Sequence, residues 1–292
     1  MRAIVIGGSG QIGTRIVDTL ESRRHICLAT TYSQSIPFFY PLDIRNDGSL
    51  HELFADFRPE VVFMAAGTSS HSYAAAHPET ASELLVESMK TLVDSMRIHG
   101  GRLVIFSGDG VFGDCATAKR EEDTLAPVGQ LANMHASMEE ILRDRLPNRH
   151  LVIRTSRVYG DSVRRVARRL ASGTIIRADN VRMSQPTFVN DLAEAAVDLA
   201  ERGHTGTLHV TGPDRHTDFA FARLVAHLYG HDADQIQPLA EADGLRPAKV
   251  WLDRFAARRL CGPDAIRPVA DAIRLIRDRS ARVPAMPALR AA

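Results

Sequence analysis

Short apolar runs alternate with longer stretches of helical periodicity along most of this chain. Continuous apolar runs of about four to eight residues are typical of strands that are buried on both faces of a parallel sheet. Such runs predict strands at residues 3–6, 25–30, 60–65, 102–107, 151–155 and 206–212. Because these strands alternate with helical stretches, we expect an α/β fold with a doubly wound parallel sheet.

The stretches between the strands carry apolar residues at intervals of three and four, which is the period of an amphipathic helix. Helices are expected to begin near residue 11 and to cover 48–57, 78–99, 124–145, 163–170 and 219–229. The helix at 163–170 is rich in arginine, with Arg164, Arg165, Arg168 and Arg169. These side chains either meet an acidic substrate or form a solvated helix face.

Glycines follow the first strand at once, in GGSGQIG at residues 7–13. Counted from its second glycine this stretch matches G-x-G-x-x-G, and counted from its first it matches the looser G-x-x-G-x-x-G. Either spacing provides a tight turn, a close backbone approach to a pyrophosphate and a helix that packs against the sheet. The candidate pyrophosphate-binding residues are Gly7, Gly10, Gln11, Ile12 and Gly13. A simple tight turn is the alternative interpretation.

The residues after the second strand favour NADPH as the cofactor, with NADH as the alternative. Rossmann folds that prefer NAD usually place an acidic residue there, on the ribose 2′-hydroxyl. This chain has Thr31 and Ser33 instead. Their hydroxyls, with Arg15 or Arg23 nearby, are candidates for holding a 2′-phosphate; the alternative is that they only cap a loop.

Two further stretches are candidates for the cofactor site. Asp43 and Ile44 are expected beside the adenine, where the carboxylate would accept a hydrogen bond from the amino group and Ile44 would cover the ring. A capping or loop role for Asp43 is an equal alternative. Ala65, Ala66 and Gly67 end the strand at 60–65 with small side chains. Small residues there let a dinucleotide lie across the strand ends at the topological switch point.

Composition narrows the partners and the compartment. The chain has 292 residues, enough for a main domain with a smaller lobe, and its net charge of +1 gives no reason to expect nucleic acid or an anionic membrane as a partner. Cys27, Cys115 and Cys261 are far apart and lack metal-ligand spacing, which indicates a reducing compartment and no metal site. The apolar runs are too short to span a bilayer, and the early first strand leaves no room for a signal peptide. A cytoplasmic protein is therefore expected.

Several motifs, in order, resemble the extended short-chain dehydrogenase/reductases, and among them the dTDP-4-dehydrorhamnose reductase-like branch. They are GGSGQIG at 7–13, DIRN at 43–46, RPEVVFMAAG at 58–67, FSGDGVFGD at 106–114, RTSRVYG at 154–160, SQPTFVNDLAEA at 184–195, GTLHVTG at 206–212 and RPAKVWLD at 246–253. The resemblance implies a Rossmann domain with a small C-terminal substrate lobe. We expect a mainly NADP-binding Rossmann domain over 1–160, to which 184–210 returns, a substrate lobe from 161–183 and 211–280, and a disordered tail at 281–292.

The resemblance also implies a catalytic Tyr, a Lys four residues later, and a Ser or Thr on a nearby strand. In this chain Leu131 stands at the Tyr position and His135 at the Lys position, whereas Glu139 of the same segment is retained. Ser107 matches the strand-end Ser or Thr. The usual proton donor is therefore absent. Ser107 and His135 are the candidate catalytic residues, and both are also expected at the cofactor; the alternative for His135 is an ordinary polar residue with its hydrogen bonds satisfied.

A ketoreductase without that Tyr and Lys needs another way to polarise the carbonyl oxygen. An aryl ketone flanked by a phenol carries its own donor, and in this respect the chain resembles the atypical ketoreductases of aromatic polyketide biosynthesis. The expected substrate is therefore a small aromatic molecule, an angucyclinone-type quinone or ketone of antibiotic biosynthesis. Two alternatives stay open. One is a non-catalytic, NADP-binding regulatory subunit that acts through a protein partner, and the other is a nucleotide-sugar 4-ketoreductase.

Overall fold

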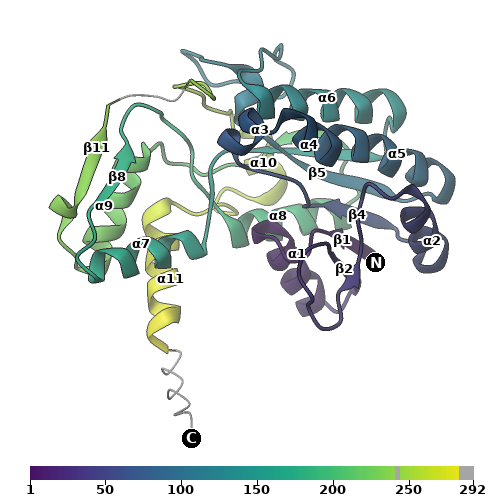
Figure 1. The fold of residues 1–292 in the computed structure, drawn as a ribbon, viewed down its shortest axis with the longest axis horizontal. Coiled ribbons are helices and arrows are strands. Elements are labelled where there is room, and N and C mark those ends of the chain that lie inside the picture. The colour runs from purple at the N-terminus through teal and green to yellow at the C-terminus, as the bar shows by residue number, and fades with distance from the viewer. Residues whose placement is uncertain (241–243, 283–292) are drawn as a thin grey trace, which may run out of the picture.

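The computed structural model describes residues 1–240 and 244–282. Its central sheet contains β1 (Arg2–Ile6), β2 (Ile26–Thr31), β3 (Tyr40–Pro41), β4 (Val61–Met64), β5 (Arg102–Gly108), β6 (His150–Thr155) and β10 (Gly206–His209). The strand order is β10-β6-β5-β4-β1-β2-β3, and all neighbouring strands are parallel (Figure 1). The winding reverses between β1 and β4, which creates a crevice at their carboxyl ends. The expected doubly wound α/β Rossmann fold is confirmed.

Helices cover both faces of this sheet, and the inner strands β1, β4 and β6 are therefore buried along nearly their whole length (Figure 1). One face packs against α2 (Asp47–Phe57), α5 (Ser88–His99) and α6 (Gln130–Arg145). The other face packs against α1 (Gln11–Ser22), α8 (Val189–Glu201) and α10 (Phe255–Cys261). The two hydrophobic cores hold the carboxyl ends of the strands in fixed positions, and the site lies at those ends.

Two regions differ from the helices that the sequence predicts. The stretch 78–99 is divided into α4 (Pro78–Ser82), a π-helical turn (Glu83–Glu87) and α5, and α3 (His71–Ala76) precedes it. The helix expected at 124–145 begins only at Gln130. Gly129 explains the late start, because its φ is +87° and a Cβ there would lie 2.1 Å from the carbonyl oxygen of Leu245. A 3-10 turn (Asp109–Phe112) follows β5.

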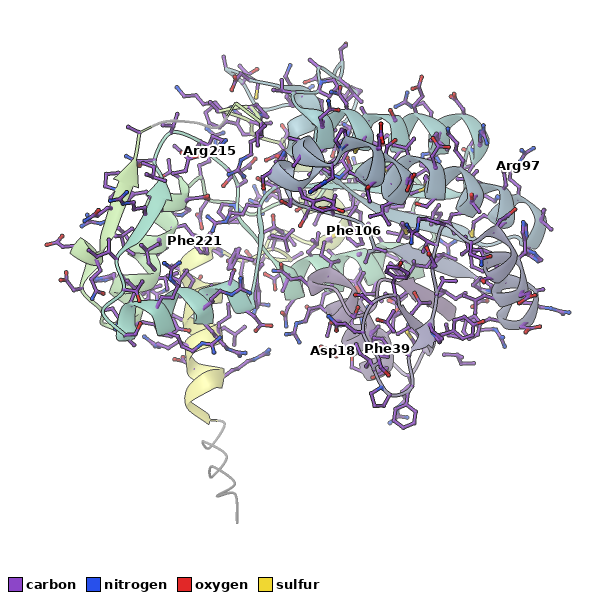
Figure 2. The ribbon with its side chains drawn as sticks, in the orientation of Figure 1. Asp18, Phe39, Arg97, Phe106, Arg215 and Phe221 are labelled. Carbon is purple, nitrogen blue, oxygen red and sulfur yellow. The ribbon has the colours of Figure 1, made fainter. Side chains whose placement is uncertain are left out.

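The smaller lobe lies beside this main body (Figure 1). It contains α7 (Asp161–Ala171), α9 (Asp218–Tyr229), α11 (Val269–Arg282), a parallel pair of β8 (Ile176–Asp179) and β11 (Ile236–Leu239), and a 3-10 turn (Ala233–Gln235). Phe221 packs in its core (Figure 2). A second parallel pair, β7 (Val158–Tyr159) with β9 (Thr187–Phe188), contributes Tyr159 and Phe188 to the same core.

The chain does not follow the expected lobe boundaries everywhere. The segment 255–266 falls in the range expected for the substrate lobe, but Ala257 and Ile266 belong to the core beneath the main sheet, with α1 and α8. Helix α11 continues to Arg282, so residues 281 and 282 are helical, whereas the rest of the expected tail, 283–292, lies outside the described residues. In the ranges 1–240 and 244–282, no helix is both long and apolar enough to cross a membrane.

Candidate active site

The glycine-rich turn between β1 and α1 is shaped by close backbone contacts. Gly7 has a φ of +81°, and a Cβ there would lie 2.6 Å from the backbone nitrogen of Ala66. A Cβ on Gly13 would lie 2.1 Å from the carbonyl oxygen of Gly7, and one on Gly10 would lie 3.2 Å from it. Helix α1 begins directly after Gly10 without a side-chain cap. A glycine-rich turn that leads into an uncapped helix N-terminus fits the pyrophosphate of a dinucleotide.

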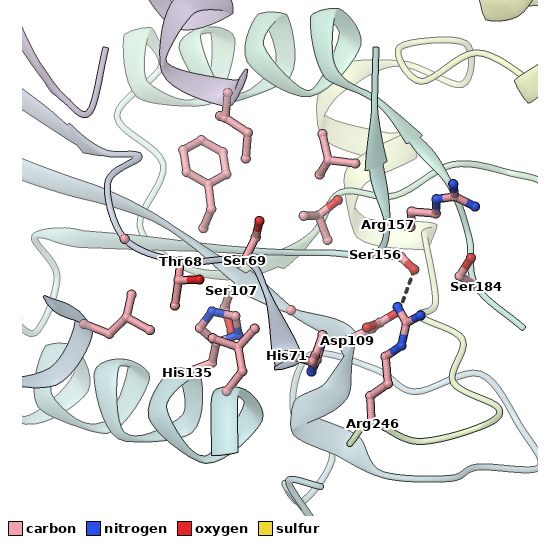
Figure 3. A pocket seen from close by; sticks show the side chains of 18 of the residues that line it. Thr68, Ser69, His71, Ser107, Asp109, His135, Ser156, Arg157, Ser184 and Arg246 are labelled. Atoms are coloured by element: carbon pink, nitrogen blue, oxygen red, sulfur yellow. Dashed lines mark hydrogen bonds between the residues drawn. The ribbon is translucent and has the colours of Figure 1, made fainter. Parts of the chain in front are cut away.

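A cavity of about 540 Å³ opens at the carboxyl ends of the central strands, between the main body and segments of the smaller lobe (Figure 3). Its lining includes the predicted residues Gly10, Gln11, Ile12, Ala65, Ala66, Gly67, Ser107 and His135. Gly7 in the turn and Gly13 in the first turn of α1 pack against each other and are not in the lining. The structure therefore brings the predicted pyrophosphate and catalytic residues into one site.

The remaining cofactor candidates lie at the ends of β2 and β3. Thr31 donates its hydroxyl hydrogen to the carbonyl oxygen three residues later at 3.0 Å, and Ser33 is exposed. Arg45 donates from Nε and Nη2 to the carboxylate of Asp43 at 2.9 and 2.7 Å, and these hydrogen bonds lower the pKa of Asp43. Ile44 was expected to cover an adenine ring, but its side chain is buried in the hydrophobic core with the residues of α2.

The arginines expected near a 2′-phosphate are engaged elsewhere. Arg15 pairs with Asp18 at 2.8 Å, and Arg23 pairs with Asp198 and with Glu201 on α8. The cation that does lie at the end of β2 is Arg45, which donates to the hydroxyl of Tyr32 at 2.8 Å. Sequence reasoning missed Arg45, although DIRN was one of the motifs, because only the structure shows that this loop folds back against β2.

The two positions where the family carries Tyr and Lys lie one helical turn apart on α6, and both line the cavity. Leu131 is 3% exposed and belongs to the core beneath the site. Burial lowers the pKa of His135 to about 4, although the Glu139 carboxylate raises it. At neutral pH this imidazole is therefore uncharged. It can hydrogen-bond a ribose, but it cannot supply the positive charge of a lysine.

Ser107 is part of a buried network behind the cavity wall. Its hydroxyl donates to Oε1 of Glu139 at 2.6 Å, and Glu139 also accepts hydrogen bonds from Nε and Nη2 of Arg154 at 3.0 and 2.7 Å. The next residue, Gly108, has no side chain, and a Cβ there would lie 3.2 Å from Nδ1 of His135. The hydrogen of Ser107 is thus committed to Glu139, which also explains why the chain keeps that glutamate.

The smaller-lobe side of the cavity carries the charged residues that sequence reasoning missed. Arg157 and Arg246 line this wall, together with Ser184 (Figure 3), and Arg182 is also in the cavity lining. Arg157 and Arg246 stand inside two of the quoted motifs, RTSRVYG and RPAKVWLD, yet nothing in the spacing indicates that both reach the cavity. The four arginines of α7, which were candidates for an acidic substrate, are exposed and do not line the cavity.

The fold and the glycine turn define a doubly wound α/β protein with a dinucleotide-binding cradle. The sequence matches the model of the RmlD substrate binding domain family over residues 1–251, and the chain belongs to this family. This confirms the expected membership in the dTDP-4-dehydrorhamnose reductase-like branch of the extended short-chain dehydrogenase/reductases.

The relatives of this chain include a methionine adenosyltransferase subunit and dTDP-sugar reductases. The chain is 23% identical over 273 residues to methionine adenosyltransferase 2 subunit beta of Bos taurus, covering 86% of this chain and 80% of the relative. It is 25% identical over 243 residues to the dTDP-4-keto-6-deoxy-D-glucose reductase of Streptomyces niveus, covering 82% of each. The crystal structure of Bacillus anthracis dTDP-4-dehydrorhamnose reductase in complex with NADP has the same fold, with a TM-score of 0.84 at 19% identity over 96% of this chain and 99% of that one.

Proposed function

We propose that this protein is an NADPH-dependent ketoreductase whose substrate, and not a tyrosine, provides the proton for the alcohol product. The observation that carries the proposal is the pair Leu131 and His135 in the cavity lining. A leucine has no proton to donate, and an imidazole with a pKa of about 4 is neutral and cannot lower the pKa of a neighbouring acid. Because the hydroxyl hydrogen of Ser107 is bound to Glu139, it is not available to a carbonyl oxygen either.

The cradle supports a nicotinamide dinucleotide as the cofactor. Gly10, Gln11 and Ile12 would hold its pyrophosphate, and His135 would hold the nicotinamide ribose. When bound, NADPH supplies the hydride for the carbonyl carbon. The complex of the Bacillus anthracis relative with NADP and the cation Arg45 at the end of β2 support NADPH, with NADH as the alternative.

We also propose that the protein is cytoplasmic. Its proposed substrate is an aromatic polyketide, an angucyclinone-type ketone whose carbonyl lies beside a phenol. The phenol donates a hydrogen bond to the carbonyl oxygen, and its proton passes to that oxygen as the new C–H bond forms. The phenolate that remains then recovers a proton from solvent. The apolar side chains Leu85, Phe106 and Met138 in the cavity lining support a flat apolar body. In its most specific form, the proposal is an angucyclinone 7-ketoreductase of the simocyclinone type.

Two other functions are favoured by particular observations. The match to the Streptomyces niveus enzyme favours a nucleotide-sugar 4-ketoreductase, and the cavity arginines would suit a diphosphate. A sugar has no acidic phenol, so that reaction would need a donor such as His71 or Asp109, which also line the cavity. The match to the Bos taurus protein favours a regulatory subunit that binds NADP and a protein partner.

The test is to titrate the purified chain with NADPH and NADH and then to follow cofactor oxidation with each of two candidate substrates. An angucyclinone ketone should be reduced to an alcohol with stoichiometric loss of NADPH. Reduction of a dTDP-4-keto-6-deoxy sugar instead would replace the aromatic proposal with the nucleotide-sugar function. Cofactor binding without turnover on either substrate, together with a stoichiometric partner in a pull-down, would replace it with the regulatory function.

A further inference from the structure

We propose that Arg157 and Arg246 form a subsite for an ionised oxygen of the substrate, on the smaller-lobe wall of the cavity. This inference deepens the proposed function and rests on it, because it concerns the part of the same substrate that lies away from the carbonyl. In Figure 3 these arginines stand on the opposite side of the cavity from Ser107 and His135. The subsite would therefore bind one end of a ligand whose other end lies at the nicotinamide.

Arg157 is fixed in place before any ligand arrives. It follows β6 in the chain, its guanidinium carbon lies 4.4 Å from the ring centroid of Phe221, and it forms an ion pair with Asp218. Burial lowers the pKa of Arg157, although Asp218 raises it. An arginine stays protonated under such a shift, so the structure holds a desolvated positive charge at the cavity. Coulombic attraction to an anion is stronger at such a site than in bulk water.

Arg246 has hydrogen-bond donors to spare. Its Nη2 lies 3.8 Å from a carboxylate oxygen of the same Asp218, which is beyond hydrogen-bond distance, and its side chain is only 33% exposed. In the part of the chain that the structure describes, Arg246 donates no hydrogen bond. One carboxylate thus faces two guanidinium groups. The fork of Arg246 remains available for a planar anion such as a carboxylate or a phenolate.

The remaining charges on this wall do not cancel that surplus. Arg182 is balanced by Asp179 at 2.6 Å. Asp109 lies beside Arg246 in Figure 3, but Ser156 donates its hydroxyl hydrogen to Oδ2 of Asp109 at 2.5 Å. Burial also raises the pKa of Asp109, which weakens its negative charge. Because Arg157 and Arg246 share the carboxylate of Asp218, this wall keeps a surplus of positive charge, which a bound anion reduces.

The other wall determines what kind of anion fits. The rest of the lining includes the apolar side chains Leu85, Leu131 and Met138, beside the polar Ser107 and His135. A ligand that satisfies both walls has an apolar body and an ionised oxygen at one edge, which describes a phenolate or carboxylate of an aromatic ketone. A nucleotide diphosphate shares the anionic oxygens but has no extended apolar body.

The experiment measures binding of two naphthalene probes of nearly equal size, the anion 2-naphthoate and the neutral 2-naphthamide, to the full chain by calorimetry, with and without NADPH. Thymidine diphosphate is the third probe. The variants are Arg246→Gln, Arg246→Lys and the control Arg215→Gln. Arg215 is outside the cavity lining and stacks on Trp251, with its guanidinium carbon 3.9 Å from the ring centroid (Figure 2). Arg246 is the preferred target because Arg157 packs on Phe221 and its loss could disturb folding.

We expect the wild type and Arg215→Gln to bind 2-naphthoate about tenfold more tightly than 2-naphthamide, the effect of one charge-assisted hydrogen bond. Arg246→Gln should lose this preference and Arg246→Lys should keep part of it. Equal affinity for the two probes in the wild type, or an unchanged preference in Arg246→Gln, overturns the subsite. Arg246-dependent binding of thymidine diphosphate but not of 2-naphthoate supports the subsite and overturns the aromatic substrate. None of the probes is reduced, so failure of the ketoreductase proposal is seen separately, in the turnover assay.

Discussion

Replacing Ser107 with alanine is expected to lower stability and to leave turnover nearly unchanged. The Ser107 hydroxyl donates to Oε1 of Glu139 at 2.6 Å, and Glu139 in turn binds Arg154 at 2.7 Å. All three residues are 3% exposed or less. A hydrogen bond to a charged group contributes about 1.5–3 kcal/mol, and the partner that loses it stays buried. We therefore expect Ser107→Ala to lower the free energy of unfolding by about 2 kcal/mol.

The assay combines urea unfolding, followed by the fluorescence of Trp251, with steady-state kinetics on the same preparation. If the slope of the unfolding free energy against urea concentration is unchanged and the midpoint concentration of urea is lower, the variant has lost stability. Ser184→Ala is the matched control, because Ser184 also lines the cavity but donates only to the backbone carbonyl of His216, at 3.2 Å. A serine that orients the substrate gives the opposite pattern, a loss in kcat of about tenfold to a thousandfold with unchanged stability. That result would refute the reasoning from the Glu139 network.

Three further predictions follow from the site. The double variant Leu131→Tyr/His135→Lys should reduce a ketone whose neighbouring phenol is methylated at least about tenfold faster than the wild type, because a protein donor is restored; an unchanged rate in the NADPH oxidation assay argues against this. The pKa of His135 is lowered from 6.5 to about 4, so its contribution to stability is present above pH 6.5 and is lost as the pH falls toward 4. Urea unfolding at pH 7.5 and pH 5 should therefore show a smaller loss for His135→Gln than for the wild type, and equal losses would contradict the shift. Arg45→Gln should raise the KM for NADPH by about tenfold while the KM for NADH stays the same. An unchanged KM for NADPH would mean that the 2′-phosphate does not bind at Arg45.

Much of the cofactor half of the site follows from local sequence. Gly10, Gln11 and Ile12 line the cavity because the glycine turn and the helix behind it are adjacent in the chain. Their geometry depends on contacts within a few residues and on the ends of β2 and β4, where Thr30 and Ala66 contact the glycine turn. Local patterns of this kind can be recognised without knowing how distant segments pack.

The substrate half cannot be predicted in this way. Arg157 and Arg246 are 89 residues apart in the sequence. Both lie near the same carboxylate only because α9 places Asp218 between them. Ser107 has the expected position on β5, but its hydrogen-bond partner depends on how α6 packs against the sheet. A sequence pattern shows which residue types are available, and tertiary packing decides where each donor points.

The choice between NADPH and NADH also depends partly on features visible in the sequence and partly on tertiary packing. The lack of an acidic residue after β2 is visible in the sequence, whereas the identity of the nearby cation is not. Arg23 is closer to that strand in sequence than Arg45, yet it is held on α8 by Asp198 and Glu201. Ion partners therefore decide where each arginine lies, and Asp43 holds Arg45 at the strand end.

The central claim is that the substrate supplies the proton, and the most direct test compares an angucyclinone ketone that has a free phenol beside its carbonyl with the methyl ether of the same compound. The measurement is kcat/KM for NADPH oxidation by the wild-type protein. The account predicts turnover of the free phenol and a loss of about a hundredfold or more for the ether, since no donor remains at the carbonyl oxygen. Equal rates for the two compounds would contradict it and would mean that a residue of the protein delivers the proton.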